Sequence, residues 1–375
     1  MDTIVIKIGM DVHSVNYTLC AMTPILGAED CVLATVQVAP DHKNVLSFIE
    51  NLKDKLGREN KYDVQCGYEA GCLGYSLYRS LKAAGVKCVI LAPTKMLAER
   101  GKRVKTDVRD ALVIAQCLAY GGYHAVYVPS EDDNSVKEYL RMRDDHKNAL
   151  KRIKQQINAF LLRLGYCFPG TKWTKKHRDW LKSLELSELN QETLTEYLVT
   201  FEELDSKIER LDKRIKELAG LPQYVKKVKR LGCFLGISVH TALSLIVETG
   251  DFSRFAKGNI YAAYLGLAPG EHSSGNHTLR TGISKAGNTH LRRLLIESGQ
   301  GICKGRIGFK SKELRARQNG NPPEVVAYAD KANERLRRRY RKMIRKGKNR
   351  NVAIAAIARE LACFAWGMMT DSIRL

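Results

Sequence analysis

The sequence predicts an α/β N-terminal domain, then a two-helix arm, then a mainly α-helical C-terminal domain, with bounds near 1–130, 131–221 and 222–375. Three observations support this prediction. Short β-rich segments alternate with helical patterns up to about residue 128, heptad-like apolar stripes follow, and a strongly basic helical region comes last. A chain of 375 residues, 44% of them apolar, is long enough to bury several cores.

The N-terminal region carries five strand signals and three helix signals. The first strand begins at Ile4 and ends at Asp11, and the others are Val15–Met22, Cys31–Val38, Val64–Tyr68 and Val86–Leu91. The second and third are close enough in sequence to form an antiparallel hairpin. One helix follows the N-cap residue Asp41, a second ends at Gly85, and a third ends near Gly121. Three strands, a helix, a strand, a helix and a strand is the order of a ribonuclease H-like α/β fold.

Four carboxylates lie where such a fold could bring them together. Asp11 and Glu69 each end an apolar strand, and Asp107 and Asp110 lie three residues apart, on one face of the third helix. Two divalent ions about 4 Å apart can neutralise charge at a phosphodiester, and Mg²⁺ needs only a few carboxylate ligands. The alternative is that Asp107 and Asp110 only form a solvated helix N-terminus. The strand-end positions of Asp11 and Glu69 favour a magnesium site.

The charge of the chain indicates its partners. A net charge of +22 with a pI near 9.6 favours nucleic acid phosphate as the partner. A membrane is disfavoured, because we find no apolar stretch of about 18 residues, no lipidation signal and no secretory leader. The ten cysteines are scattered through apolar segments without a C-x-x-C pair, so we expect a cytoplasmic protein without zinc or disulfides.

Heptad-like stripes mark the predicted arm. Leu150, Ile153, Ile157, Phe160 and Leu164 form the first stripe, and Leu204, Ile208, Leu211, Ile215 and Leu218 form the second. Turn-forming residues lie between them, so we expect an antiparallel coiled coil. The basic residues on its first helix and at its tip are either a solvated face or a grip on nucleic acid.

The third region begins with a helix-hairpin-helix pattern around Leu231–Ser238, an element that can offer main-chain N–H groups to DNA phosphates. The alternative is an ordinary pair of helices. Further on, residues 270–282 form a polar loop flanked by basic residues, and it contains the adjacent serines Ser273 and Ser274.

Taken together, these motifs resemble the DEDD, Piv-like insertion-sequence transposases, a family of RNA-guided serine recombinases. The resemblance covers nearly the whole chain. It rests on Gly9-Met10-Asp11-Val12-His13, on Glu69, on Lys105-Thr106-Asp107-x-x-Asp110-Ala111, on Gly266-Leu267-x-Pro269-x-x-His272-Ser273-Ser274-Gly275, and on Gly282-Ile283-Ser284-Lys285-x-Gly287-Asn288-x-x-Leu291-Arg292.

The resemblance implies a RuvC-like domain in which Asp11, Glu69, Asp107 and Asp110 bind Mg²⁺. It also implies that Ser273 is the nucleophile, with Ser274 as the alternative. The expected partners are donor and target DNA, a structured non-coding guide RNA (bridge RNA), and further copies of the chain as a dimer to tetramer. Base pairing by the RNA then reads the DNA sequence, and the protein recognises backbone and shape.

Basic residues are the candidates for nucleic-acid contact. Between Lys331 and Arg350 eleven residues are Lys or Arg and one, Glu334, is acidic, which favours a phosphate-binding helix face. The candidate residues are Arg280, Lys285, Arg292, Arg293, Arg337, Arg338, Arg339 and Arg341. We expect the last helix, from Val352 to Trp366, to pack into the third domain.

Two other functions remain open on the sequence alone. One is a metal-dependent junction nuclease in which the four acids do all the chemistry without a covalent serine intermediate. The other is a non-enzymatic nucleic-acid scaffold in which the carboxylates are structural.

Overall fold

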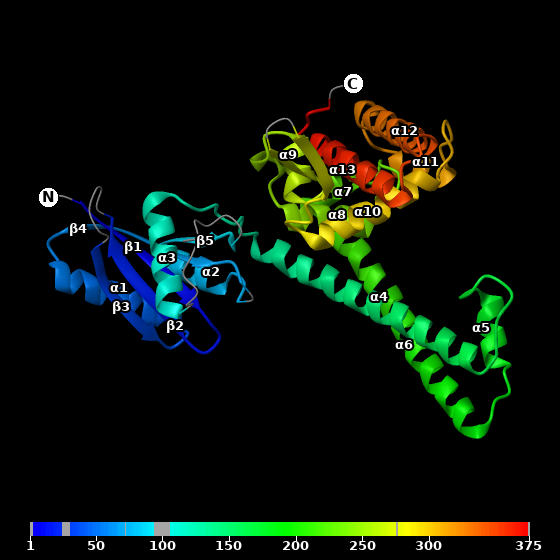
Figure 1. Cartoon of the computed structure of the whole chain (residues 1–375), viewed down its shortest axis with the longest axis horizontal. Helices are drawn as coiled ribbons and strands as arrows, with labels where there is room; N and C mark the ends of the chain where they lie inside the picture. The colour runs from blue at the N-terminus through cyan, green and yellow to red at the C-terminus, as the bar shows by residue number, and fades with distance from the viewer. Residues whose placement is uncertain (1–2, 25–30, 72, 94–105, 275–276, 374–375) are drawn as a thin grey trace. The chain divides into compact units, whose positions relative to one another are not determined.

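A computed structural model describes residues 3–24, 31–71, 73–93, 106–274 and 277–373, and only the backbone of residues 271–274 and 277–280 (Figure 1). The chain forms two compact units, Met1–Val128 and Pro129–Leu375. Each unit has its own apolar core. The second contains both the predicted arm and the predicted C-terminal domain.

The first unit is built on a five-stranded mixed sheet with strand order β3-β2-β1-β4-β5. The strands are β1 (Thr3–Val12), β2 (Tyr17–Thr23), β3 (Cys31–Val38), β4 (Lys61–Glu69) and β5 (Lys87–Leu91). The helices are α1 (His42–Leu56), α2 (Ser76–Ala83) and α3 (Asp107–Tyr120). β1 pairs antiparallel with β2 and parallel with β4, while β5 extends the parallel half. This mixed α/β arrangement is compatible with a ribonuclease H-like transposase domain.

Local sequence signals explain these elements. Asp41 caps α1 by accepting a hydrogen bond from the backbone N–H of Lys43, as its position predicts. Alternate β1 residues Ile6, Ile8 and Met10 are buried in one core with α1 and α2. The second strand begins later than predicted, because Val15 lies outside it with 76% of its surface exposed.

The second unit begins with two long helices, α4 (Glu131–Arg163) and α6 (Glu188–Ala219), with the short α5 (Lys175–Lys182) near the far end of the pair (Figure 1). Both predicted stripes contribute to their shared core, including Ile153, Ile157 and Phe160 from α4 and Ile208 from α6. We call this pair the arm. Its apolar spacing explains why the two helices fold back on each other.

The rest of the second unit is a helical body with one two-stranded sheet. Its helices are α7 (Pro222–Leu231), α8 (Val239–Thr249), α9 (Gly258–Tyr264), α10 (Thr289–Lys304), α11 (Lys312–Gln318), α12 (Pro323–Arg345) and α13 (Arg350–Met369). By length and composition α13 could cross a membrane, but its Ile357, Leu361 and Ala365 lie fully buried in the core. It packs into this unit as predicted.

The polar loop predicted around Ser273 contains a β-hairpin. The strands β6 (Pro269–Ser274) and β7 (His277–Ile283) pair antiparallel, and Ser273 lies opposite Thr278. Threonines on β7 favour strand structure, and the polar composition of the segment hides that signal. We call β6 and β7 the serine hairpin.

Candidate functional site

Two glycines position the acidic residues of the first unit. A Cβ atom on Gly9 of β1 would lie 1.9 Å from the carbonyl oxygen of Ala111 and 2.4 Å from the nitrogen of Ala115, both on α3. Gly67, opposite Gly9 on β4, would bring a Cβ atom to 2.9 Å from Leu118 of the same helix. The missing side chains let α3 lie directly on the sheet.

The same pairing aligns two of the four predicted acids. Side chains two residues apart on a strand share a face, so Asp11 and Glu69 project on the α3 side, like Gly9 and Gly67. Both lie at the carboxyl ends of parallel neighbours. We call Asp11, Glu69, Asp107 and Asp110 the acid edge.

Three side chains at the acid edge come within reach of one metal ion. Ligand atoms of Asp11, His13 and Asp107 all lie within 4.8 Å of one another, and Nε2 of His13 is 3.2 Å from Oδ2 of Asp11. His13 has no assigned role in the sequence prediction. The sequence signal that could have identified His13 is its spacing of two residues from Asp11, because this spacing puts the two side chains on the same side of an extended chain.

The electrostatics of Asp11 favour a bound cation. Burial is the main reason why the pKa of Asp11 is raised, and the charges of Asp110 and Asp107 raise it further against the opposing effect of His13. Asp110 is therefore electrostatically part of the cluster, although among the described residues the three-ligand group does not include it. A divalent ion would offset this repulsion.

The donor set fits a divalent metal. Carboxylate oxygens suit Mg²⁺, whereas the imidazole of His13 also suits Mn²⁺ and other transition ions. The Glu69 side chain is exposed, and in the described part of the chain it lies outside the three-ligand group. Its role as a fourth ligand stays a prediction.

The base of the serine hairpin is held by a tightly packed loop. A Cβ on Gly287 would lie 1.9 Å from the carbonyl oxygen of Tyr264, and φ at Gly287 is +86°. Arg292 donates from Nη1 to the carbonyl oxygens of Leu265 and Ala286, at 3.0 and 3.3 Å. Arg292, predicted to clamp phosphate, thus holds the loop that joins the hairpin to α10.

The other predicted phosphate contacts differ in their exposure, and one of them, Arg293, pairs with Asp144 and Glu297. Arg337 is 7% exposed and donates to the carbonyl oxygen of Phe309, which differs from the expectation, because a buried guanidinium cannot form part of a phosphate-binding face. Lys285, Arg338 and Arg341 are exposed, and Arg339 is partly exposed. Arg280 and Ser273 belong to the segment whose side chains lie outside the described part of the structure, as does Ser274.

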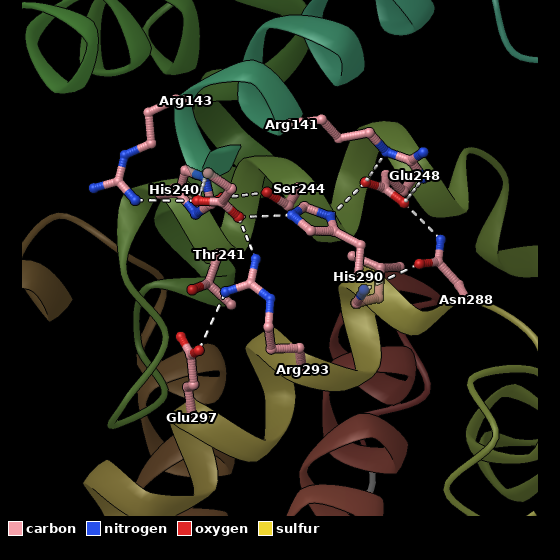
Figure 2. A network of polar contacts seen from close by, with 12 residues as sticks. Arg141, Arg143, His240, Thr241, Ser244, Glu248, Asn288, His290, Arg293 and Glu297 are labelled. Atoms are coloured by element: carbon pink, nitrogen blue, oxygen red, sulfur yellow. Dashed lines mark hydrogen bonds and ion pairs between the residues drawn. The ribbon is translucent and has the colours of Figure 1, made fainter. Parts of the chain in front are cut away.

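A buried polar network ties the arm to the start of α10 (Figure 2). Nδ1 of His290 is 2.6 Å from Oε1 of Glu248, and Nε2 of His290 is 2.7 Å from Oδ2 of Asp144 on α4. Glu248 also accepts from Asn288, the N-cap of α10, and pairs with Arg141. We call these residues, with Arg293 and His240, the polar network.

The two histidines of the polar network have opposite pKa shifts. Burial alone would lower the pKa of His290, but hydrogen bonds to Asp144 and Glu248 outweigh it and raise the pKa to about 9. Burial lowers the pKa of His240 to about 4, although the charge of Asp144 opposes this shift. His290 is therefore the cation between two carboxylates, and His240 is neutral near pH 7. The sequence pattern gave no signal for either.

The predicted helix-hairpin-helix lies at α7, residues 232–238 and α8. Several of its amides already have acceptors inside the protein. The N–H groups of Phe234 and Ile237 donate within the hairpin, and that of Leu235 donates to Asn333 of α12 at 2.8 Å. These N–H groups are not available to a DNA phosphate, so this geometry favours the alternative of an ordinary helix pair.

Comparison with known proteins identifies the family. A DEDD transposase model of the IS110 type, described as "Transposase", matches residues 8–165, and the model described as "Transposase IS116/IS110/IS902 family" matches residues 228–307. The first match contains the acid edge, and the second contains the serine hairpin.

Related proteins extend the likeness along the chain. A putative transposase of Sinorhizobium fredii is 35% identical over 308 residues, which cover 81% of this chain and 75% of the relative. The transposase for insertion sequence element IS1533 of Leptospira borgpetersenii is 33% identical over 90% of this chain and 96% of its own. The pilin gene-inverting protein of Moraxella bovis is 26% identical over 61% of this chain and 63% of its own. With family models matched in both units and two relatives at least 33% identical over 81% and 90% of its length, the chain belongs to the IS110/IS116 family of insertion sequence transposases.

Proposed function

We propose that this transposase cuts and rejoins DNA through a covalent intermediate at Ser273, with Mg²⁺ at the acid edge and with a structured non-coding RNA that pairs with donor and target DNA. The observation that carries the proposal is the group formed by Asp11, His13 and Asp107, whose ligand atoms lie within 4.8 Å of one another. A metal site in a strongly basic chain is suited to phosphodiester chemistry.

The serine step conserves the energy of the phosphate ester bond. The Ser273 hydroxyl loses its proton and attacks the scissile phosphorus, an Oγ–P bond forms, and the bond from phosphorus to one deoxyribose oxygen breaks, giving a free strand hydroxyl. The hydroxyl of a second strand then attacks the phosphoserine and releases the serine. Because each step exchanges one phosphate ester for another, strands are resealed without ATP.

The acid edge supports that step electrostatically. A bound Mg²⁺ would stabilise the negative charge that develops on the phosphate. Asp11, His13, Asp107 and Asp110 would hold the ion, with Glu69 completing the set. The acids and Ser273 belong to different units. We propose that both act on one phosphate when DNA is bound, either within one chain or between copies in a dimer or tetramer.

The name of one relative supports a reaction in which cut DNA ends are rejoined. One relative is named for inverting a pilin gene, and inverting a DNA segment requires that every cut end be resealed. A recombinase with a phosphoserine intermediate provides this resealing, whereas a plain nuclease leaves the ends free. We therefore favour the recombinase over the junction nuclease.

Replacing Ser273 with Ala tests the chemistry. The wild-type protein, purified with its bound RNA and given Mg²⁺ and labelled donor DNA, should form a protein–DNA adduct that survives denaturation. Ser273→Ala should abolish both adduct and cleavage, and Ser274→Ala is the matched control that keeps them. Cleavage that persists in Ser273→Ala without an adduct would establish the nuclease instead.

The guide RNA is tested independently. RNA that co-purifies with the full-length chain should be sequenced and compared with the DNA that flanks its gene. We expect one structured species whose loops are complementary to donor and target. Random cellular RNA of no fixed sequence would refute RNA guidance while leaving the serine chemistry in place.

A further inference from the structure

We propose that a cleft beside the base of the serine hairpin binds a single-stranded segment of the DNA that is being exchanged. The inference rests on the proposed function, because it places a DNA strand next to Ser273. The cleft has a volume of about 950 Å³, and its lining includes Ile260, Pro269, Arg335, Arg339 and Phe364. We call it the α9 cleft.

The floor of the α9 cleft is apolar. α9 lies directly on α13, because Gly258 has no side chain and a Cβ there would meet Cys363 at 3.0–3.2 Å. Phe364 is half-buried beside this contact, and Ile260 is 47% exposed although it is a large apolar residue. An exposed apolar floor suits the face of an unpaired base, which a base in duplex DNA cannot present.

The rim of the α9 cleft is cationic and preorganised. Arg335 and Arg339 lie one helical turn apart on α12, and both pair with Glu360 of α13, Arg339 at 3.0 Å. The side chain of Glu360 is 13% exposed, whereas those of Arg335 and Arg339 are 61% and 38% exposed. The carboxylate thus fixes two guanidinium groups whose other N–H donors are accessible to phosphate.

The net charge of the lining agrees with a phosphate ligand. Among the described lining residues four are cationic and one, Glu360, is acidic. The cationic residues are Lys331, Arg335, Arg339 and Arg359. Proteins that hold single strands without reading their sequence bind the backbone phosphates with cationic side chains and stack the bases on apolar ones. The rim and the floor of the α9 cleft would divide these two roles.

The position of Pro269 favours DNA over RNA as the occupant. Pro269 lines the cleft and begins β6, and Ser273 lies four residues further along the same strand. At about 3.3 Å per residue, these two backbone positions are roughly 13 Å apart. A strand lying in the cleft is therefore close to the serine that reacts with DNA, whereas the guide RNA does not react.

Binding measurements can separate this site from the catalytic proposal. The full-length Ser273→Ala protein, without Mg²⁺, is titrated with a fluorescent 12-nucleotide single-stranded DNA, with the same sequence as RNA and with the DNA duplex. Adding Arg335→Gln and Arg339→Gln should weaken single-stranded DNA binding about tenfold. It should also reduce the slope of log K against log salt by about 1.4, because each of the two lost phosphate contacts contributes about 0.7 to that slope. Because no catalysis is measured, failure of the serine mechanism cannot affect this result.

The matched control removes the same charge from another helix of the same unit. Lys213→Gln with Lys216→Gln alters two exposed residues of α6 that lie outside the cleft lining, and it should leave single-stranded DNA affinity within about twofold. An equal loss in both double variants would show diffuse attraction rather than a site and would overturn the proposal. A loss confined to RNA would assign the cleft to the guide instead.

Cross-linking provides a second measurement that needs no substitution in the cleft. Single-stranded DNA that carries 5-iododeoxyuridine is irradiated with the protein, and the attached peptides are mapped by mass spectrometry. We expect attachment within α9 or at Phe364 of α13. Cross-links found only elsewhere in the chain would refute the site even if the arginine variants failed to fold.

Discussion

Nδ1 of His290 lies 2.6 Å from a carboxylate oxygen of Glu248, whose side chain is 1% exposed. The opposite nitrogen of the same ring is 2.7 Å from Asp144, so one imidazole joins α10 to both α8 and α4. The cation lies between two anions in a water-poor site, where the loss of one partner leaves a buried charge unpaired. The arm and the helix that follows the serine hairpin are thus held together by a protonated histidine.

The first prediction concerns pH. The pKa of His290 is raised to about 9 from its ordinary value of 6.5, so its contribution to stability is complete below about pH 6.5 and is lost as the pH rises through 9. We expect the protection of α10 amides in hydrogen exchange, corrected for intrinsic rates, to fall over that range.

His290→Gln is the variant for this test. It should lower the protection at neutral pH and remove most of its alkaline dependence, because glutamine stays neutral. Unchanged alkaline dependence in the variant would assign it to another group. His146→Gln is a control, since His146 lies on α4, the helix that carries Asp144, and is partly exposed.

The second prediction concerns the close approach of α3 to the sheet. Gly9→Ala should destabilise the first unit by about 1–3 kcal/mol or more, because the added methyl group would overlap backbone atoms of α3, which cannot move as a flexible side chain can. Denaturant unfolding followed in the first unit measures the loss. Gly71→Ala is the control, with its nearest neighbour 3.9 Å away, and a similar loss there would contradict the argument.

The third prediction concerns the metal ligands. Asp11→Asn should weaken Mg²⁺ and Mn²⁺ binding at least about tenfold, as measured by calorimetry. It should not lower stability, because burial and neighbouring acids already disfavour the Asp11 charge in the absence of a cation. Metal binding that survives Asp11→Asn would place the ion elsewhere.

The fourth prediction concerns the preference of the site for Mn²⁺ over Mg²⁺. His13→Gln should weaken Mn²⁺ binding more than Mg²⁺ binding, because imidazole is a better ligand for the transition metal. The measurement is the ratio of the two dissociation constants in wild type and variant. An unchanged ratio would show that His13 only supports Asp11 through their 3.2 Å contact.

The fifth prediction separates buried from exposed arginines. Arg337→Gln should cost about 1–3 kcal/mol of stability, because the Phe309 carbonyl loses its donor. It should leave the salt dependence of nucleic-acid binding unchanged. Arg338→Gln, one residue along on the exposed face, should change stability by less than about 1 kcal/mol. A reversed pattern would restore Arg337 to the phosphate-binding face.

Local pattern alone determined much of this protein. The alternation of apolar residues predicted five strands and their helices, Asp41 was recognised as a cap, and Asp11 and Glu69 were placed at strand ends. The apolar last helix was correctly assigned to the core. These features depend on residues within a few positions of one another, and periodicity and capping record them directly.

Tertiary structure decided which charged residues pair and which are buried. His13 and Asp107 are 94 positions apart in the sequence (107 minus 13), yet their ligand atoms lie within 4.8 Å of each other. His290 and Asp144, which are in hydrogen-bond contact, are 146 positions apart. Arg337 and Arg338 are neighbours in one basic run, yet one is buried and the other exposed. The environment of a charge depends on what packs against it, and that is set by contacts between distant segments that no local pattern encodes.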